Sequence, residues 1–388
     1  MDSEISGVPN HGVPDNNLEN NARLPDLLRK IFLNESGLRA AWRFLIYLLL
    51  LVAISLVIGP VVSHFVGHVR GTPPPRLLYL QEIMGFAIVF GAALIMARIE
   101  HRTAAVYGIP AKGAFGKLFW QGWLFGLAEI CALVGLIAAF GGYAFGSLAL
   151  HGTDLLRWAL IWGVFFVFVG LFEEFSFRGY SQCTLADATL VEVAALLALL
   201  LILLAKFAPH FPRKPYVFAI WAAAVLLVGL VQRLSYRGPT QLMLKEGIGF
   251  WPAATLLSVG FGAIHLGNPG EGLVGAASVV VVGLFLAFTL KRTGNLWFAI
   301  GLHASFDFGE TFLFSVPNSG IVMDGHLSNS SLHGAKWLTG GTVGPEGSVF
   351  SFITMGLLAV IVHYCYPPKK QDVVVVADSQ IASTGPLS

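Results

Sequence analysis

The residues best suited to chemistry lie at the end of a long apolar run that begins near Leu155, where Glu173 and Glu174 are followed by Arg178. On a helix, Glu174 and Arg178 share one face and can neutralise each other. Glu173 points about a quarter turn away and has no such partner in its own helix. Each charge near the centre of a bilayer costs about 2.5–3.5 kcal/mol. We therefore interpret Glu174 and Arg178 as a structural ion pair and Glu173 as the leading candidate for catalysis.

Two later apolar segments carry histidines. His265 follows Phe261 by four residues, and His303 precedes Asp307 by the same spacing. On a helix, His303 and Asp307 share one face, so the carboxylate can orient or charge the imidazole. Glu310 lies three residues further on and could face the same way. For His265, an interhelical hydrogen bond that only supports packing is an equal alternative.

Together these side chains form a set that can act on water. Glu173 can accept a proton from water as it attacks a carbonyl, and His265 can share that proton. His303 with Asp307 can donate to the oxyanion that forms. Glu173, His265 and His303 also resemble a catalytic zinc arrangement with one open position, so zinc remains an alternative cofactor. The HExxH and GxSxG signatures do not occur in the sequence.

Composition predicts the environment of these residues. Hydrophobic residues make up 55% of the chain, charged residues only 12%, and the mean hydropathy is +0.72, which is typical of a polytopic membrane protein. The net charge of +2 leaves no basic stripe for nucleic acid once the basic residues that flank membrane spans are counted. The three cysteines are far apart, which argues against a disulfide framework or a zinc knuckle.

Apolar runs long enough to span a bilayer, or nearly so, predict an all-α transmembrane bundle of about eight to ten helices. The basic residues alternate between loops in a way that places both termini in the cytoplasm. In the third of these spans Glu129 is the only acid, and we interpret it as a packing contact, with support of the site as the alternative. The runs cover residues 44–66, 77–97, 117–140, 156–177, 189–208, 216–232, 251–266, 273–290, 295–314 and 349–365.

The polar motifs follow one another in a recognisable order. They are Glu173-Glu174-x-x-x-Arg178, Phe261-x-x-x-His265 and His303-x-x-x-Asp307. In this order they resemble the motifs of the CPBP family of intramembrane proteases, also called the Abi or CAAX protease and bacteriocin-processing family. That family includes the type II prenyl-protein proteases. The resemblance covers residues 155–315.

The resemblance implies a role for each motif residue. Glu173 matches the catalytic glutamate, which activates water together with His265. The positions of Glu174 and Arg178 match the supporting pair of the first motif. His303 and Asp307 match the positions that stabilise the oxyanion, although many family members have Asn in place of Asp307.

The function implied is an intramembrane endopeptidase of the glutamate type or the metal-dependent type. Its substrate would be a peptide or protein, with a lipid-modified one as an option, and membrane lipid would surround it. A transporter is the competing class, and a non-catalytic immunity or scaffold protein is a third. The family's distribution implies a bacterial cytoplasmic membrane, with an internal eukaryotic membrane as the alternative.

The sequence divides into a series of segments. The spacing between Arg178 and His265 is longer than the family implies, so we expect an inserted hairpin at about 189–235. We also expect the Glu173 helix to continue past Arg178 towards Asp187. A Gly/Ser/Asn-rich loop at 316–348 is either a functional cover or a connector. The expected segments are a cytoplasmic tail with a short interfacial helix (1–38), N-terminal spans (39–150), the catalytic core (151–315), the loop (316–348), the last span (349–366) and a disordered tail (367–388).

Overall fold

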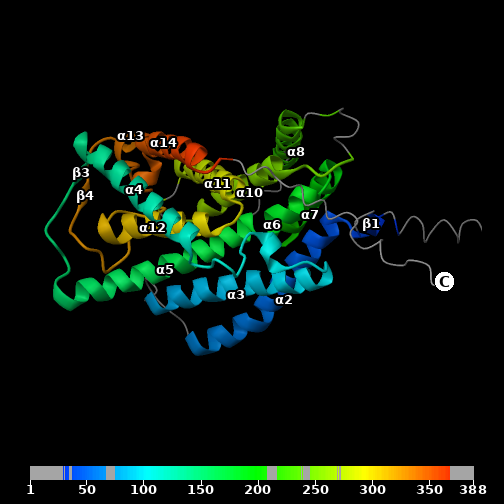
Figure 1. Ribbon diagram of the computed structural model, residues 1–388, viewed down its shortest axis with the longest axis horizontal. Helices are drawn as coiled ribbons and strands as arrows, with labels where there is room; N and C mark the ends of the chain where they lie inside the picture. The colour runs from blue at the N-terminus through cyan, green and yellow to red at the C-terminus, as the bar shows by residue number, and fades with distance from the viewer. Residues whose placement is uncertain are drawn as a thin grey trace, which may run out of the picture.

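The computed structural model describes residues 29, 31–34, 37–66, 75–207, 216–236, 238, 245–268, 270 and 272–367. It confirms the all-α polytopic bundle (Figure 1). Most of the expected interfacial helix and nearly all of the C-terminal tail lie outside the described residues. Within the described part, five helical segments are long and apolar enough to cross a membrane: Ala40–Pro60, Leu77–Ile99, Lys117–Ala139, Gly152–Asp187 and Leu273–Thr293.

The helices follow the apolar runs of the sequence because a lipid-embedded chain must satisfy its backbone hydrogen bonds internally. Short elements occupy the connections. These are the 3-10 helices η1 (Ala104–Tyr107) and η3 (Pro345–Gly347), the π-helical turn η2 (Gly309–Leu313), and two antiparallel strand pairs, β1 (Leu33–Asn34) with β2 (Gly37–Leu38) and β3 (Tyr143–Ala144) with β4 (Ser331–Leu332). The α-helices are α2 (Ala40–Val66), α3 (Pro75–Ile99), α4 (Lys117–Ala139), α5 (Gly152–Arg178), α6 (Tyr180–Asp187), α7 (Leu190–Phe207), α8 (Tyr216–Ser235), α10 (Phe250–His265), α11 (Leu273–Thr293), α12 (Trp297–Phe308), α13 (Lys336–Thr339) and α14 (Val349–Cys365).

Helix α12, which carries His303 and Asp307, lies at the centre of the bundle between α4 and α5 (Figure 1). Its residues Phe298, Ala299 and Ile300 point in different directions around the helix, and all three are completely buried. A helix that is apolar all round is one that other elements surround. The position of α12 is therefore set by its neighbours on several sides.

Glycine allows α4 and α12 to approach each other closely. A Cβ atom at Gly126 would lie 2.1 Å from the carbonyl oxygen of Leu302, and a Cβ at Gly301 would lie 2.1 Å from that of Phe119. Small residues at such positions let two membrane helices pack backbone against backbone. This contact fixes the depth and rotation of α12.

Helix α5 does not continue unbroken towards Asp187, which corrects the sequence-based expectation. The helix stops before Gly179, and α6 begins directly after it. A Cβ at Gly179 would lie 2.4 Å from the carbonyl oxygen of Phe175. The next residue, Tyr180, is fully buried, and its hydroxyl donates to Glu100 at 2.5 Å. The break between α5 and α6 thus accompanies tertiary contacts of Tyr180, which the spacing of residues in the sequence does not reveal.

Helices α7 and α8 contact each other, as expected for a hairpin, and lie at one edge of the bundle (Figure 1). The indole nitrogen of Trp221 in α8 donates to the carbonyl oxygen of Ala194 in α7 at 3.1 Å. Helix α8 also packs on α10, the helix that ends at His265. The hairpin therefore contacts the helix that carries His265, and none of its described residues lines the site.

Candidate active site

The second glutamate of the first motif is fully buried and has two partners. Oε1 of Glu174 accepts a hydrogen bond from Arg178 Nη1 at 3.1 Å, so the predicted ion pair is present. The same oxygen lies 2.8 Å from Nδ1 of His303. Because an ionised carboxylate only accepts, the proton of this bond belongs to Nδ1. Glu174 thus orients the His303 ring as well as pairing with Arg178.

The guanidinium of Arg178, which extends from α5, packs closely against residues of α10 and α11. Its Cζ atom lies 4.8 Å from the ring centroid of Phe261, within the range of a cation–π contact. On the other side, a Cβ at Gly283 would come within 2.8 Å of Nη2 of Arg178. Glycine at this position therefore leaves the room that the guanidinium needs to reach Glu174.

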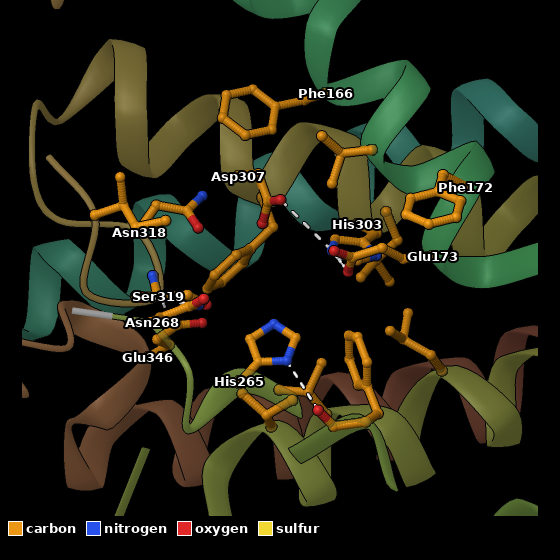
Figure 2. A pocket seen from close by; sticks show the side chains of 18 of the residues that line it. Phe166, Phe172, Glu173, His265, Asn268, His303, Asp307, Asn318, Ser319 and Glu346 are labelled. Carbon is orange, nitrogen blue, oxygen red and sulfur yellow. Dashed lines mark hydrogen bonds and ion pairs between the residues drawn. The ribbon is translucent and has the colours of Figure 1, made fainter. Parts of the chain in front are cut away.

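The other nitrogen of His303 faces two further carboxylates. Nε2 lies 3.6 Å from Oε2 of Glu173 and 3.5 Å from Oδ2 of Asp307. Figure 2 shows the three side chains facing one another. Both distances exceed a direct hydrogen bond but lie within reach of an ion pair or a bridging water. The side chain of Glu173 is 25% exposed, in contrast to the fully buried Glu174. Glu173 is therefore the acid that a molecule in the cavity can contact.

His265 lies across the cavity from this group (Figure 2). Its Nδ1 is 2.9 Å from the carbonyl oxygen of Phe261 in its own helix, and a carbonyl only accepts, so Nδ1 carries the proton. Nε2 is then left as an acceptor for a proton in the cavity. Among the described residues His265 makes no interhelical hydrogen bond, so the structure gives no support to a role in packing alone.

The side chains of four motif residues line one cavity of about 370 Å³. Glu173 comes from α5, His265 from α10, and His303 and Asp307 from α12. Aromatic and aliphatic side chains form most of its walls, including Phe165, Phe166, Phe172, Phe261, Phe285, Phe306, Leu78, Leu286, Leu302, Ile264, Ile321, Val169, Val279, Val282, Met323 and Met355. Titratable groups from separate helices in one apolar cavity are typical of an active site.

Sequence reasoning missed several polar residues of the cavity. Glu82 of α3 is one of them, and its isolation in an apolar run was a signal of the kind that singled out Glu173. Gln81 of α3 and Ser351 of α14 were missed as well. The rest lie in connections, where no periodicity indicates which way a side chain points: Asn268, Asn318, Ser319 and Glu346.

The Gly/Ser/Asn-rich loop supplies one wall of the cavity. The amide nitrogen of Ser319 donates to Oε1 of Glu346 at 2.5 Å, which ties the two ends of the loop together. Nδ2 of Asn268, three residues beyond His265, donates to the carbonyl oxygen of Ser319 at 3.2 Å. The loop therefore contributes residues to the wall of the cavity.

Two further acids differ in how they relate to the cavity. Glu129 of α4 lines it and is only 7% exposed. Glu310 is completely buried in η2, and it is not among the residues that line the cavity. Neither carboxylate oxygen of Glu310 has a hydrogen-bond partner within the described part of the chain. Glu310 therefore does not join His303 and Asp307 as the helical spacing suggested.

Glu173, His265 and His303 are the residues considered as alternative zinc ligands. In the part of the chain that the structure describes, no three His, Cys, Asp or Glu side chains are placed so that they could hold one ion together. His265 in particular has no ion pair or hydrogen bond with Glu173 or His303.

Comparison with known protein families finds one match. Residues 212–309 match a family model described as Rce1-like, type II CAAX prenyl endopeptidase Rce1-like. The matched segment begins before α8 and contains His265, His303 and Asp307, whereas Glu173 and Glu174 precede it. No curated protein and no solved structure matches the chain. The family match agrees with the resemblance to the CPBP/CAAX proteases over these residues, and the apolar helices support a multi-pass integral membrane protein.

Proposed function

We propose that this chain, as its family match suggests, is an intramembrane endopeptidase in which Glu173 and His265 activate water to hydrolyse a peptide bond. The observation that carries the proposal is the cavity, which brings Glu173, His265, His303 and Asp307 together from three helices. A cavity with acid, base and apolar walls is suited to peptide hydrolysis away from bulk water.

The first step forms a bond between water and the substrate carbonyl. Water sits between the Glu173 carboxylate and Nε2 of His265, where both can accept a hydrogen bond from it. Glu173 takes a proton as the water oxygen attacks the carbonyl carbon. The carbonyl π electrons move to oxygen and produce a tetrahedral oxyanion.

The oxyanion is stabilised from the side of α12. A proton on Nε2 of His303 points towards the cavity and donates to the developing negative charge. Glu174 fixes the ring through Nδ1, and Arg178 fixes Glu174. Asp307 lies 3.5 Å from Nε2 and favours a proton there. When the C–N bond breaks, protonated Glu173 returns its proton to the leaving amine nitrogen, and a carboxylic acid and an amine result.

The substrate in this proposal is a peptide segment with apolar side chains, because most of the cavity wall is apolar. A lipid-modified segment is one option within this class. No step is assigned to a metal ion. The proposed location is a bacterial cytoplasmic membrane, where the substrate would enter from within or at the edge of the bilayer.

The test uses the full chain purified in an uncharged detergent, incubated with a mixture of apolar peptides in water enriched in oxygen-18. We expect internal cleavage with one heavy oxygen in each new carboxyl group, detected by mass spectrometry. The variant Glu173→Gln should not cleave, whereas the matched variant Glu246→Gln, at an exposed position, should. Equal cleavage by both variants would overturn the proposal.

A further inference from the structure

The titratable side chains that line the cavity are mostly acidic. Its acidic side chains are Glu82, Glu129, Glu173, Asp307 and Glu346, and its histidines are His265 and His303. No Lys or Arg occurs among the lining residues that the structure describes. A cavity with charges of one sign and apolar walls concentrates ligands of the opposite charge.

Within the described part of the chain, Glu82 has no hydrogen-bond or ion-pair partner that accounts for its position. It lies on α3, close enough to Glu173 and His303 to interact with both electrostatically. Among the described residues, no hydrogen bond or ion pair reaches its carboxylate. An acid in an apolar span is costly unless it is paired or has a function. Glu82 therefore remains available to a group that enters the cavity.

Glu129 presents the same feature from α4. Its side chain is more than nine-tenths buried, lines the cavity, and has no hydrogen bond or ion pair within the described part of the chain. Its helix packs on α12, whereas α3 packs on α5. Two helices thus each aim one unpartnered carboxylate at the same space.

The histidines do not offset these acids. His303 is already surrounded by Glu173, Glu174 and Asp307 at 3.6, 2.8 and 3.5 Å. His265 donates its Nδ1 proton to a carbonyl and offers the cavity an acceptor. A negatively charged substrate group would therefore meet further carboxyl groups and, among the residues that the structure describes, no free cation.

We infer that the cavity selects a peptide segment with a lysine or arginine side chain among apolar residues near the scissile bond, and rejects a segment with a carboxylate there. The inference rests on the proposed function for the cleavage of that segment, but the binding preference can be tested separately. Glu82 and Glu129 are the residues assigned to the cation. Because Glu82 is next to Glu173, it binds a cationic side chain close to the bond that is cut.

The test compares three apolar peptides that differ at one central position, which is Lys, Gln or Glu. Binding is measured by fluorescence anisotropy in an uncharged detergent, with the Glu173→Gln variant so that no peptide is cleaved. We expect the Lys peptide to bind at least about tenfold more tightly than the Glu peptide, as for a partly buried charge pair. Equal binding of the Lys and Glu peptides, or tighter binding of the Glu peptide, would overturn the inference.

Two variants in the same background assign the preference to the named residues. When Glu82→Gln and Glu129→Gln are both added to the Glu173→Gln variant, the difference in affinity between the Lys and Glu peptides should disappear. Adding Glu246→Gln instead, at an exposed position, should leave that difference unchanged. A preference for lysine that survives both changes would refute the assignment. The comparison of the Lys and Glu peptides does not require either variant to fold.

Cleavage by the unmodified chain separates this inference from the proposed function. Tighter binding of the Lys peptide without hydrolysis of any peptide would support the inference and contradict the protease. Hydrolysis of Lys and Glu peptides at equal rates would support the protease and contradict the inference.

Discussion

Oε1 of Glu174 lies 2.8 Å from Nδ1 of His303, although 129 positions separate the two residues in the chain. The bond joins the first sequence motif to the third. Since the same oxygen pairs with Arg178, the orientation of the His303 ring depends on a buried cation that does not line the cavity. Glu174 and Arg178 are therefore positioning residues in this account.

Because Glu174 and Arg178 form a buried ion pair, replacing one of them should destabilise the protein more than replacing both. Glu174→Leu should destabilise the protein by about 3–5 kcal/mol, because it leaves the Arg178 charge buried without its partner. The double variant Glu174→Leu/Arg178→Met should recover much of that loss, since no uncompensated charge remains. Thermal unfolding in detergent measures both effects.

The double variant Glu174→Leu/Arg178→Met should regain stability without regaining activity. The double variant lacks the acceptor that orients His303, so its cleavage rate should stay low even where its unfolding temperature recovers. A double variant as unstable as Glu174→Leu alone, or one that cleaves at the normal rate, would show that the pair does not act in this way.

Gly283 is predicted to affect catalysis through Arg178. The Cβ of Gly283→Ala would approach Nη2 of Arg178 and Oγ of Ser258 within 2.8 Å, and both are ends of side chains that can move. We expect a lower kcat with a modest change in stability. Gly260→Ala on α10 is the matched control, because a Cβ there meets nothing within 4 Å. An unchanged kcat for Gly283→Ala would exclude this coupling.

The close packing of α4 on α12 predicts a stability effect. At Gly126 a methyl group would meet backbone atoms of α12, which cannot move aside as a side chain can, so Gly126→Ala should destabilise the protein by about 1–3 kcal/mol. Gly135→Ala on the same helix meets nothing within 4 Å and should be neutral or slightly stabilising. Unfolding temperatures of the two variants measured together would test this, and similar values would contradict the packing argument.

The sequence predicts the helices well because each depends on a continuous apolar run. The run at 349–365 has the same ends as α14, and the run at 189–208 differs from α7 by one residue at each end. Pairs four residues apart are also local, so the contacts within Glu174–Arg178 and His303–Asp307 follow from helical geometry.

What the sequence does not predict depends on contacts between distant segments. The bond from Glu174 to His303 requires the packing of α5 on α12. The break at Gly179 accompanies the burial of Tyr180, and neither is visible in the spacing of residues. Glu82 was within reach of sequence reasoning, since it is an isolated acid in an apolar run.

The arrangement of the cavity predicts that hydrolysis does not depend on zinc. A zinc chelator should leave the cleavage rate of the purified chain unchanged, and metal analysis should find less than one zinc per chain. Loss of activity that added zinc restores would contradict this and favour a metal-dependent mechanism, with Glu173, His265 and His303 as the ligands.

The rate of a single turnover by Glu173→Gln tests the central claim most directly, with Glu246→Gln as the matched control. Because Gln cannot accept the proton of water, the account predicts a rate constant at least about 100-fold lower than that of the unmodified chain, at equal peptide binding and unfolding temperature. A rate within a few-fold of the control would contradict the claim that Glu173 activates water.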